Sequence, residues 1–221
     1  MKNNTIKKLF IIAISGLFMF CSADVSRDNA LDPLSEKYVE PEPPAPTGPF
    51  VIFVTATIDT AGTYMYGETY NGNLGGISGA DTKCNNSMLN PDTSKQYKAL
   101  LVDGAARAAS PQVDWVLLPN IEYQRPDGTV IGTTNTNAVF NFPLTNRFAP
   151  NDGTGMYYPS YWTGLNSDWS TSPNDCNDWN APAAQFGTIG IGASLNTDSI
   201  SEYMGPYDCY MMNLPLLCVE Q

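Results

Sequence analysis

The stretch Asp208–Gln221 reads DCYMMNLPLLCVEQ, and its cysteines indicate how this segment is fastened to the fold. It contains two cysteines, Cys209 and Cys218, and the second lies three residues before the end of the sequence. Chain ends fray unless contacts fasten them. A cysteine in this place therefore indicates a covalent tie, and the apolar residues before it are compatible with an extended strand.

Two further cysteines, Cys84 and Cys176, precede this stretch, and Cys21 lies near the start of the sequence. An even number of cysteines in an exported chain is typical of a disulfide framework. Four cysteines allow three pairings. A bond between Cys209 and Cys218 needs a tight reversal, which an extended strand before Cys218 would prevent. The residues alone leave the remaining pairings open.

Residues 1–21 have the three parts of an export signal. An apolar core of twelve residues, Leu9–Phe20, is too short to span a bilayer comfortably. Cys21 follows at once, as in bacterial lipoproteins, so we expect a lipoprotein signal peptide with Cys21 as the lipidated residue. The alternative is cleavage after Ala23, which would give a secreted or periplasmic protein. The positive charges before the core are Lys2, Lys7 and Lys8.

Residues 22–49 are predicted to be a tether, because Glu40–Pro49 is rich in proline and favours an extended polyproline II path. Residues 50–221 suit one domain of ordinary size. Ser78 is a predicted N-cap of a short helix that turns Ala80, Cys84 and Met88 inward. The composition of residues 171–205 predicts long ordered loops.

Apolar or alternating patterns predict several short strands, and an Asp-Gly pair predicts a tight turn at residues 127–128. We expect an α+β domain with one or two helices and antiparallel strands. The predicted strands are Phe50–Asp59, Tyr97–Asp103, Gln112–Pro119 and Asn137–Leu144.

The formal net charge is −11. Without the three lysines of the leader, the chain has eight basic and 22 acidic residues. Such a field repels phosphate backbones and sulfated sugars, which argues against nucleic acid and heparin as partners. The chain has no histidine, which excludes a His general base and a His-bearing zinc site. Without a Gly-x-Ser-x-Gly elbow or a phosphate loop, we expect no enzyme.

Several motifs together resemble a known family. A helix cysteine, the tetrad WTGL at Trp162–Leu165 and three later cysteines ending in LCVE resemble the C-type lectin-like fold. Gly75–Cys84, Asp175–Asn180 and Asp208–Glu220 are similar to segments of its collagen-derived member, endostatin. With the leader, the chain resembles leptospiral endostatin-like outer-membrane lipoproteins. The resemblance covers Gly75–Gln221.

This resemblance implies a disulfide-tied C-type lectin-like (endostatin-like) domain with the pairs Cys84–Cys218 and Cys176–Cys209. It also implies a lipid-anchored protein of the outer membrane and cell surface. Its implied partners are host extracellular-matrix proteins, such as laminin and fibronectin, and complement regulators, such as factor H. Tyrosine is favoured at interfaces, so the candidate partner-binding residues are tyrosines near predicted loops. They are Tyr157, Tyr158, Tyr161, Tyr203 and Tyr207, with Tyr210 beside them.

Two other functions remain open. A Ca²⁺-dependent lectin of this fold would need a carboxylate or amide before Pro and a Trp-Asn-Asp motif; Ser172–Asp175 and Asn177–Asn180 lack these, so the pattern argues against Ca²⁺. Asn and Asp there are more typical of turns. A structural envelope lipoprotein without an adhesin role is the third possibility. The zinc and heparin sites of endostatin do not carry over, and no cofactor is expected.

Overall fold

The structure is a computed structural model that describes residues 47–58, 64–150, 159–181, 184–202 and 205–221. The chain divides after Pro44, and every element below belongs to the second unit, Ala45–Gln221. The expected signal peptide with Cys21, and nearly all of the expected tether, lie outside the described residues.

The second unit is an α+β domain made mostly of short strands. Its helices are α1 (Gly76–Asn86), α2 (Cys176–Trp179) and the 3₁₀ helix η1 (Thr197–Ser199). Its strands are β1 (Phe50–Val54), β2 (Ala56–Ile58), β3 (Tyr64–Gly67), β4 (Tyr97–Ala99), β5 (Ala108–Ala109), β6 (Gln112–Val113), β7 (Glu122–Gln124), β8 (Val130–Thr133), β9 (Ser160–Trp162), β10 (Phe186–Gly187), β11 (Ile189–Ile191), β12 (Tyr207–Asp208) and β13 (Leu217–Glu220).

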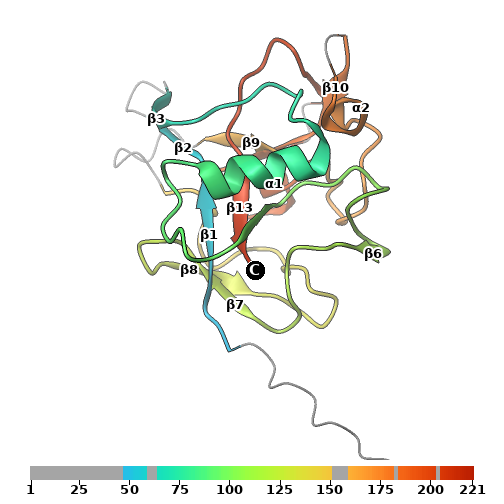
Figure 1. The fold of residues 1–221 in the computed structure, drawn as a ribbon. Helices are drawn as coiled ribbons and strands as arrows, with labels where there is room; N and C mark the ends of the chain where they lie inside the picture. The colour runs from blue at the N-terminus through green and yellow to red at the C-terminus, as the bar shows by residue number, and fades with distance from the viewer. Residues whose placement is uncertain (1–46, 59–63, 151–158, 182–183, 203–204) are drawn as a thin grey trace, which may run out of the picture. The chain divides into compact units, whose positions relative to one another are not determined.

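The largest sheet has the strand order β4-β13-β1-β7-β8. β13 is antiparallel to both neighbours, so that Cys218 lies opposite Phe53 of β1 and Ala99 of β4. β1 is parallel to β7, and β7 is antiparallel to β8. Figure 1 shows β1 and β13 side by side. The last strand of the chain therefore fills an interior position of the sheet, which explains why its end does not fray.

Both faces of this sheet are covered. In β1, Ile52 and Val54 belong to one apolar cluster and Phe53 to another. In β13, Leu217 belongs to the first cluster and Cys218 to the second. Because successive side chains of a strand point to opposite faces, the two clusters lie on the two faces of the sheet. Strands buried on both faces are apolar throughout rather than alternating.

The helix α1 packs against the face that carries Phe53 (Figure 1). Its buried residues recur at the three- and four-residue spacing of one helical face. They are Ile77, Ala80 and Cys84. Cys84 is bonded to Cys218, and Cys176 is bonded to Cys209. These are the two pairs that the family resemblance implied.

Two expectations about α1 are wrong. The N-cap is Gly75, not Ser78, because the chain enters the helix with φ of 82°, a left-handed value that favours glycine. Met88 lies beyond the end of the helix, after Ser87 has taken an extended conformation, and its side chain is 59% exposed rather than buried.

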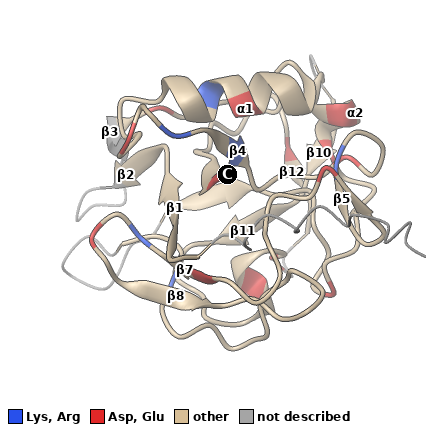
Figure 2. Cartoon of the chain, turned by 60° about the horizontal axis from the view of Figure 1, so that its bottom comes forward, with Lys and Arg blue, Asp and Glu red and all other residues tan. Residues whose placement is uncertain are grey.

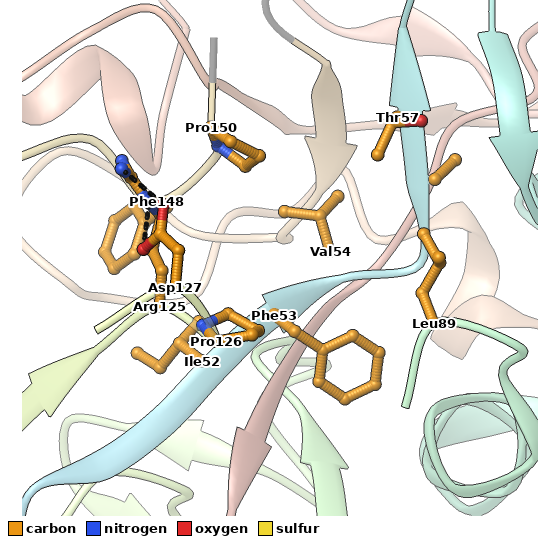
Figure 3. A pocket seen from close by; sticks show the side chains of 11 residues that line it. Ile52, Phe53, Val54, Thr57, Leu89, Arg125, Pro126, Asp127, Phe148 and Pro150 are labelled. Atoms are coloured by element: carbon orange, nitrogen blue, oxygen red, sulfur yellow. Dashed lines mark hydrogen bonds and ion pairs between the residues drawn. The ribbon is translucent and has the colours of Figure 1, made fainter. Parts of the chain in front are cut away.

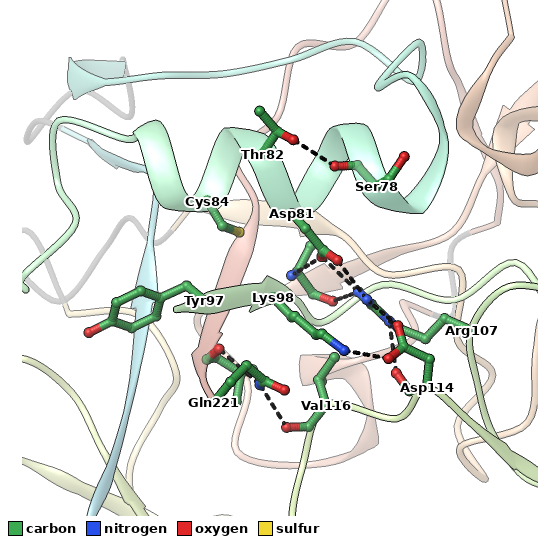
Figure 4. Close-up of polar contacts among 12 residues, drawn as sticks. Ser78, Asp81, Thr82, Cys84, Tyr97, Lys98, Arg107, Asp114, Val116 and Gln221 are labelled. Carbon is green, nitrogen blue, oxygen red and sulfur yellow. Dashed lines mark hydrogen bonds and ion pairs between the residues drawn. The ribbon is translucent and has the colours of Figure 1, made fainter. Parts of the chain in front are cut away.

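Arg107 is fully buried and fastens α1 to β4 (Figure 4). Its Nη1 and Nη2 donate to the two carboxylate oxygens of Asp81 in α1, at 2.9 and 2.7 Å. Nη2 also donates to Asp114 Oδ2 at 2.6 Å, and Nη1 to the carbonyl of Ala99 at 2.9 Å. A buried cation needs such partners to offset its loss of water. This arginine is therefore a structural tie and not a ligand-binding residue.

Two strand predictions are largely wrong. Of Gln112–Pro119 only the two residues of β6 are strand, and Asn137–Leu144 forms no strand beyond a bridge between Phe140 and Thr134. Apolar residues of both segments are nonetheless buried in the first cluster. In Asn137–Leu144, where Ala138 has a positive φ, the alternation of apolar residues results from turns that direct single side chains inward and not from strand pairing.

The other local predictions agree better with the structure. Phe50–Asp59 becomes β1 and β2, and Tyr97–Asp103 becomes β4 followed by buried, irregular chain. The predicted turn is confirmed: Gly128, with φ of 82°, donates its N–H to Arg125 O at 2.9 Å between β7 and β8. Residues 171–181 and 184–202 are mostly loop, with the short elements α2, β10, β11 and η1. Among the described residues, no helix is long and apolar enough to cross a bilayer.

Candidate partner-binding surface

A short ribbon of two strands presents large apolar side chains to solvent. β10 pairs with β12 in antiparallel register, with Phe186 opposite Asp208. Phe186 is 48% exposed, and Tyr210 and Met211, which follow β12, are 59% and 73% exposed. Only two other large hydrophobic side chains of the described chain are exposed, Met88 and Val113. Single exposed apolar residues are ordinary, but three on one short ribbon make it a candidate interaction surface. We call Phe186, Tyr210 and Met211 the ribbon patch.

The turn after β12 fixes the backbone of the ribbon patch. Asp208 Oδ1 accepts the N–H of Tyr210 at 2.8 Å and the N–H of Met211 at 2.9 Å. An Asp side chain that bonds the backbone two and three residues ahead is a common device for shaping turns. The two side chains therefore project from a backbone of defined geometry.

The disulfide Cys176–Cys209 lies directly under the ribbon. Cys209 donates its N–H to Gln185 O, which continues the strand pairing, and its carbonyl accepts the N–H of Gly72 at 2.7 Å. A methyl group on Gly72 would lie 2.3 Å from Cys176 Sγ. One on Gly187 would lie 2.6 Å from the same sulfur. The bond is therefore packed between two backbones that have no room for a side chain.

Cys176 begins a left-handed turn, α2. Cys176, Asn177, Asp178 and Trp179 all have φ between 54° and 60°. L-residues in this region cost about 1–2 kcal/mol each, although Asn and Asp tolerate it better than others. Burial offsets the strain, because Cys176 and Trp179 are fully buried and Trp179 Nε1 donates to Val102 O at 2.8 Å. The turn therefore depends on the same disulfide as the ribbon.

The surroundings of the ribbon are acidic. After Arg147 the sequence has no Lys or Arg but eight Asp or Glu, and Figure 2 shows red segments at α2 and β12, with a blue segment near β5. Burial raises the pKa of Asp175, and the charges of Asp178 and Asp103 raise it further. This side of the domain would attract a partner with basic side chains and repel an acidic one.

The structure treats the predicted tyrosines differently. Tyr157, Tyr158 and Tyr203 lie outside the described residues. The expectation for Tyr161 is wrong, because its side chain is fully buried and its hydroxyl donates to Ser199 O at 2.8 Å. Tyr207 is half-buried, and its hydroxyl donates to Glu202. Burial, followed by the bond to Glu202 and its charge, raises the pKa of Tyr207 to about 12.

Sequence reasoning missed Phe186 and Met211. Both are bulky apolar residues in the closing part of the chain, where Asn, Ser, Gly and Pro dominate. That contrast is the signal that could have identified them. Tyr210, which the sequence placed beside the candidate tyrosines, is exposed as a binding residue must be.

A separate apolar pocket of about 280 Å³ lies beside the junction of β1 and β2 (Figure 3). Apolar side chains such as Val54, Leu89 and Phe148 line it. Its charged residues are Arg125 and Asp127, which pair with each other at 3.1 Å between Nη2 and Oδ2. This pocket offers no unpaired charge to a ligand and suits an apolar group.

The segments that were compared with calcium motifs serve as turns. Ser172 is buried, and its hydroxyl accepts a hydrogen bond from Thr188 Oγ1 at 2.7 Å. Asp175 caps α2 by accepting the N–H of Asp178 at 3.2 Å. Among the described residues, no group of three or more Asp, Glu or Cys side chains is arranged to hold a metal ion.

Residues 67–195 match a sequence family described as "Protein of unknown function (DUF1554)". The chain belongs to the DUF1554 family. No curated protein matches the chain. The DUF1554 match contains α1, the WTGL tetrad, Cys84 and Cys176, but it ends before the disulfide partners of both cysteines. It also omits β1 and β13, the neighbours at the centre of the sheet. The folded unit is therefore larger than the DUF1554 match.

Proposed function

We propose that this DUF1554 protein is a surface lipoprotein that binds host extracellular-matrix proteins, such as laminin and fibronectin, or complement regulators, such as factor H. The observation that carries the proposal is the ribbon patch, three large apolar side chains exposed together on a disulfide-fixed ribbon. Aromatic and Met side chains are enriched at protein interfaces. Because their backbone is already ordered, binding requires little further loss of conformational entropy.

The acidic surroundings add a preference for basic partners. Opposite charges speed association and select partners more than they raise affinity. We therefore expect the association rate to fall with added salt, while the ribbon patch governs dissociation. No chemistry is performed on the partner in this proposal.

The scaffold proposed for this role is a C-type lectin-like, endostatin-like domain. Its support is the pairing of Cys84 with Cys218 and of Cys176 with Cys209, together with the WTGL tetrad that joins β9 to the core. In the tetrad, Gly164 has φ of 68°, and a methyl group there would lie 2.5 Å from Val102 O. The place of this glycine is therefore fixed by close backbone packing.

The proposed anchor is a lipid on Cys21, with the proline-rich segment before the domain as a spacer to the outer membrane. Its support is the order of charged, apolar and cysteine residues in the leader. Mass spectrometry of the mature N-terminus tests it. A diacylated or triacylated Cys21 is expected, and an unmodified chain that begins at Asp24 would contradict lipidation. Surface proteolysis of intact cells then tests exposure.

Surface plasmon resonance of the mature chain over immobilised laminin, fibronectin and factor H tests the binding function. At least one is expected to bind saturably, with or without a chelator. The variant Phe186→Ser/Tyr210→Ser/Met211→Ser should lose about 30-fold or more in affinity, the effect of removing an interface hot spot.

Met88→Ser is the matched control, because Met88 is exposed to the same extent as Tyr210 but lies outside the ribbon. It should bind as the unaltered protein does. Equal affinity of the triple variant and the control would refute the ribbon patch as the binding surface. Binding that a chelator abolishes would favour the calcium lectin, and no binding to any of the three proteins would favour a structural role.

A further inference from the structure

A second hollow, of about 420 Å³, lies outside the ribbon and has a different chemistry. Three loops build it: the β5–β6 turn, the segment around Asn137 and the turn at Asp168–Trp169. Gln112 Nε2 donates to Asn137 O at 2.7 Å and so links the first two loops. Ala109, Val139 and Trp169 supply apolar lining, and Gln112, Asn137 and Asp168 supply polar groups. We call this hollow the Trp169 pocket.

Trp169 is held rigidly but with strain. Its ring stacks on Phe142 with a centroid distance of 5.7 Å and an interplanar angle of 13°, and it meets Trp115 edge-on at 6.0 Å. Its φ of 69° is a left-handed value, which is uncommon for a bulky side chain. The turn that imposes this value is closed by the Trp169 N–H donating to Asn166 O at 3.0 Å.

The indole N–H of Trp169 lacks the partner that the other tryptophans have. Trp115, Trp162 and Trp179 each donate Nε1–H to a backbone carbonyl, at 2.7 to 2.8 Å. Trp169 is only 6% exposed, yet its Nε1–H has no acceptor among the described residues. The group is also not sealed in the core, because the one enclosed side-chain polar atom without a partner in the described chain is Ser199 Oγ. The N–H is therefore open to solvent, where a ligand atom can replace the water that it would otherwise bind.

Other polar groups of the pocket are also free to bind. Asp168 uses Oδ1 to accept from Ser170 N and Oγ, at 3.0 and 2.6 Å, which leaves Oδ2 available. The side-chain amide of Asn137 makes no hydrogen bond in the described chain, although its backbone makes two. The pocket thus offers an N–H donor, a carboxylate acceptor and an amide that does both.

These features define the chemistry of a ligand. The described lining contains no Lys or Arg and contains Asp168, so an anion would be repelled. An ammonium group could pair with Asp168, but it has no lone pair to accept from the indole N–H. Vicinal hydroxyls both donate and accept, and the C–H face of a sugar ring suits the apolar lining. The volume lies in the range of about 300–1,000 Å³ that is usual for small-molecule sites.

We propose that the Trp169 pocket binds one ring of a neutral sugar without calcium. The ring accepts a hydrogen bond from Trp169 Nε1–H through one hydroxyl and exchanges hydrogen bonds with Asn137 and Asp168 through others. This activity is independent of protein binding by the ribbon patch, since none of the residues is shared.

Saturation-transfer-difference NMR of the mature chain tests the proposal, with the methyl glycosides of glucose, galactose, mannose and N-acetylglucosamine in buffer that contains a chelator. At least one should receive saturation, with a dissociation constant near about 1 mM, as expected for a few hydrogen bonds in an open site. The methyl glycoside of glucuronic acid should bind about tenfold more weakly because of Asp168.

Two variants locate the site. Trp169→Phe keeps a ring to stack on Phe142 but removes the N–H, and Asn137→Ala removes an exposed amide. Each should weaken sugar binding about tenfold, the effect of one hydrogen bond. Asn213→Ala, which alters an exposed amide outside the lining, is the control and should bind normally. Unchanged affinity in both variants, equal binding of the glucuronide, loss of binding in chelator or silence of all four neutral probes would each overturn the proposal.

Discussion

The domain uses its two disulfides in two contrasting regions. Cys84–Cys218 joins α1 to an interior strand of a sheet that is already buried on both faces. Cys176–Cys209 lies beneath a ribbon whose strands have two residues each and whose end carries the ribbon patch. The sheet would keep many apolar contacts without its bond, whereas the ribbon has few. One disulfide therefore adds stability to a core, and the other maintains a surface.

Removing the bond in the sheet should have the largest effect on global stability. The chain-entropy treatment assigns up to about 5 kcal/mol to a loop of 134 residues. Cys84→Ala/Cys218→Ala should therefore lower the free energy of unfolding in urea by up to that amount. At temperatures where the variant remains folded, partner binding should be retained. Loss of binding by a folded variant would show that the two regions are not separable.

Removing the disulfide under the ribbon should lower the free energy of unfolding less than removing Cys84–Cys218, but it should weaken partner binding more. The same treatment gives up to about 4 kcal/mol for a loop of 33 residues. Cys176→Ala/Cys209→Ala should also release the strained turn α2, so amide exchange should rise in residues 176–187 and 207–212 before the sheet opens. Partner binding should fall with it. If amide exchange rises equally in the sheet, the bond does not stabilise the ribbon locally, and the prediction is wrong.

A smaller change sharpens the same contrast without removing a covalent bond. Gly72→Ala places a methyl group 2.3 Å from Cys176 Sγ and 2.6 Å from Cys209 Cβ. The backbone must shift, which costs about 1–3 kcal/mol. Gly128→Ala is the opposite case, because nothing lies within 4 Å of its methyl position but its φ of 82° is unfavourable for alanine, whereas Gly72 has no positive φ. The two variants thus separate crowding from backbone conformation, and an unchanged free energy of unfolding in urea for Gly72→Ala would contradict crowding at the disulfide.

The smallest expected effect is on the pH dependence of stability and concerns Asp114, which pairs with Arg107 and with Lys98 of β4. Burial raises the pKa of Asp114, but hydrogen bonds and charges from Lys98 and Arg107 outweigh it and lower the pKa below its usual value. A lowered pKa stabilises the folded state above the unfolded value of about 3.9, and this contribution is lost as pH falls through the folded value. The variant Asp114→Asn removes the charge, and asparagine tolerates the positive φ of 41° at this position as aspartate does.

Because Asp114 is 42% exposed at its side chain, the difference between the variant and the unaltered protein should be about 1 kcal/mol or less at pH 7. That difference should shrink below about pH 4 in urea unfolding measured across pH. A difference that persists at pH 2 would show that charge pairing is not its cause.

The two regions also differ in how far the sequence predicted them. Near-continuous apolar runs, as in Phe50–Val54, are specified by burial on both faces, so the central strands were predictable. The Asp-Gly turn depends on local conformation and was predictable too. By contrast, Gln112–Pro119 contains an apolar run and Asn137–Leu144 alternates, yet in both segments turns direct single residues into the core. Neither pattern distinguishes this from a strand.

The binding surface was less predictable for a physical reason. Whether a tyrosine in a loop is buried or exposed depends on contacts distant in sequence: Tyr161 is buried because it bonds Ser199, 38 residues away, and Tyr210 is exposed because Asp208 turns the chain outward. Likewise, only the structure shows that the indole N–H of Trp169 has no acceptor among the described residues, whereas those of the other three tryptophans donate to backbone carbonyls. Composition indicates that such loops carry aromatic residues, but not which face solvent.

Hydrogen exchange of the mature chain, alone and with whichever of laminin, fibronectin or factor H it binds, tests the central claim most directly. The account predicts that the bound partner slows exchange in residues 185–187 and 207–212 and leaves α1 and the loops around Asn137 unchanged. Slowed exchange confined to α1 or to other loops, with the ribbon unaffected, would contradict it.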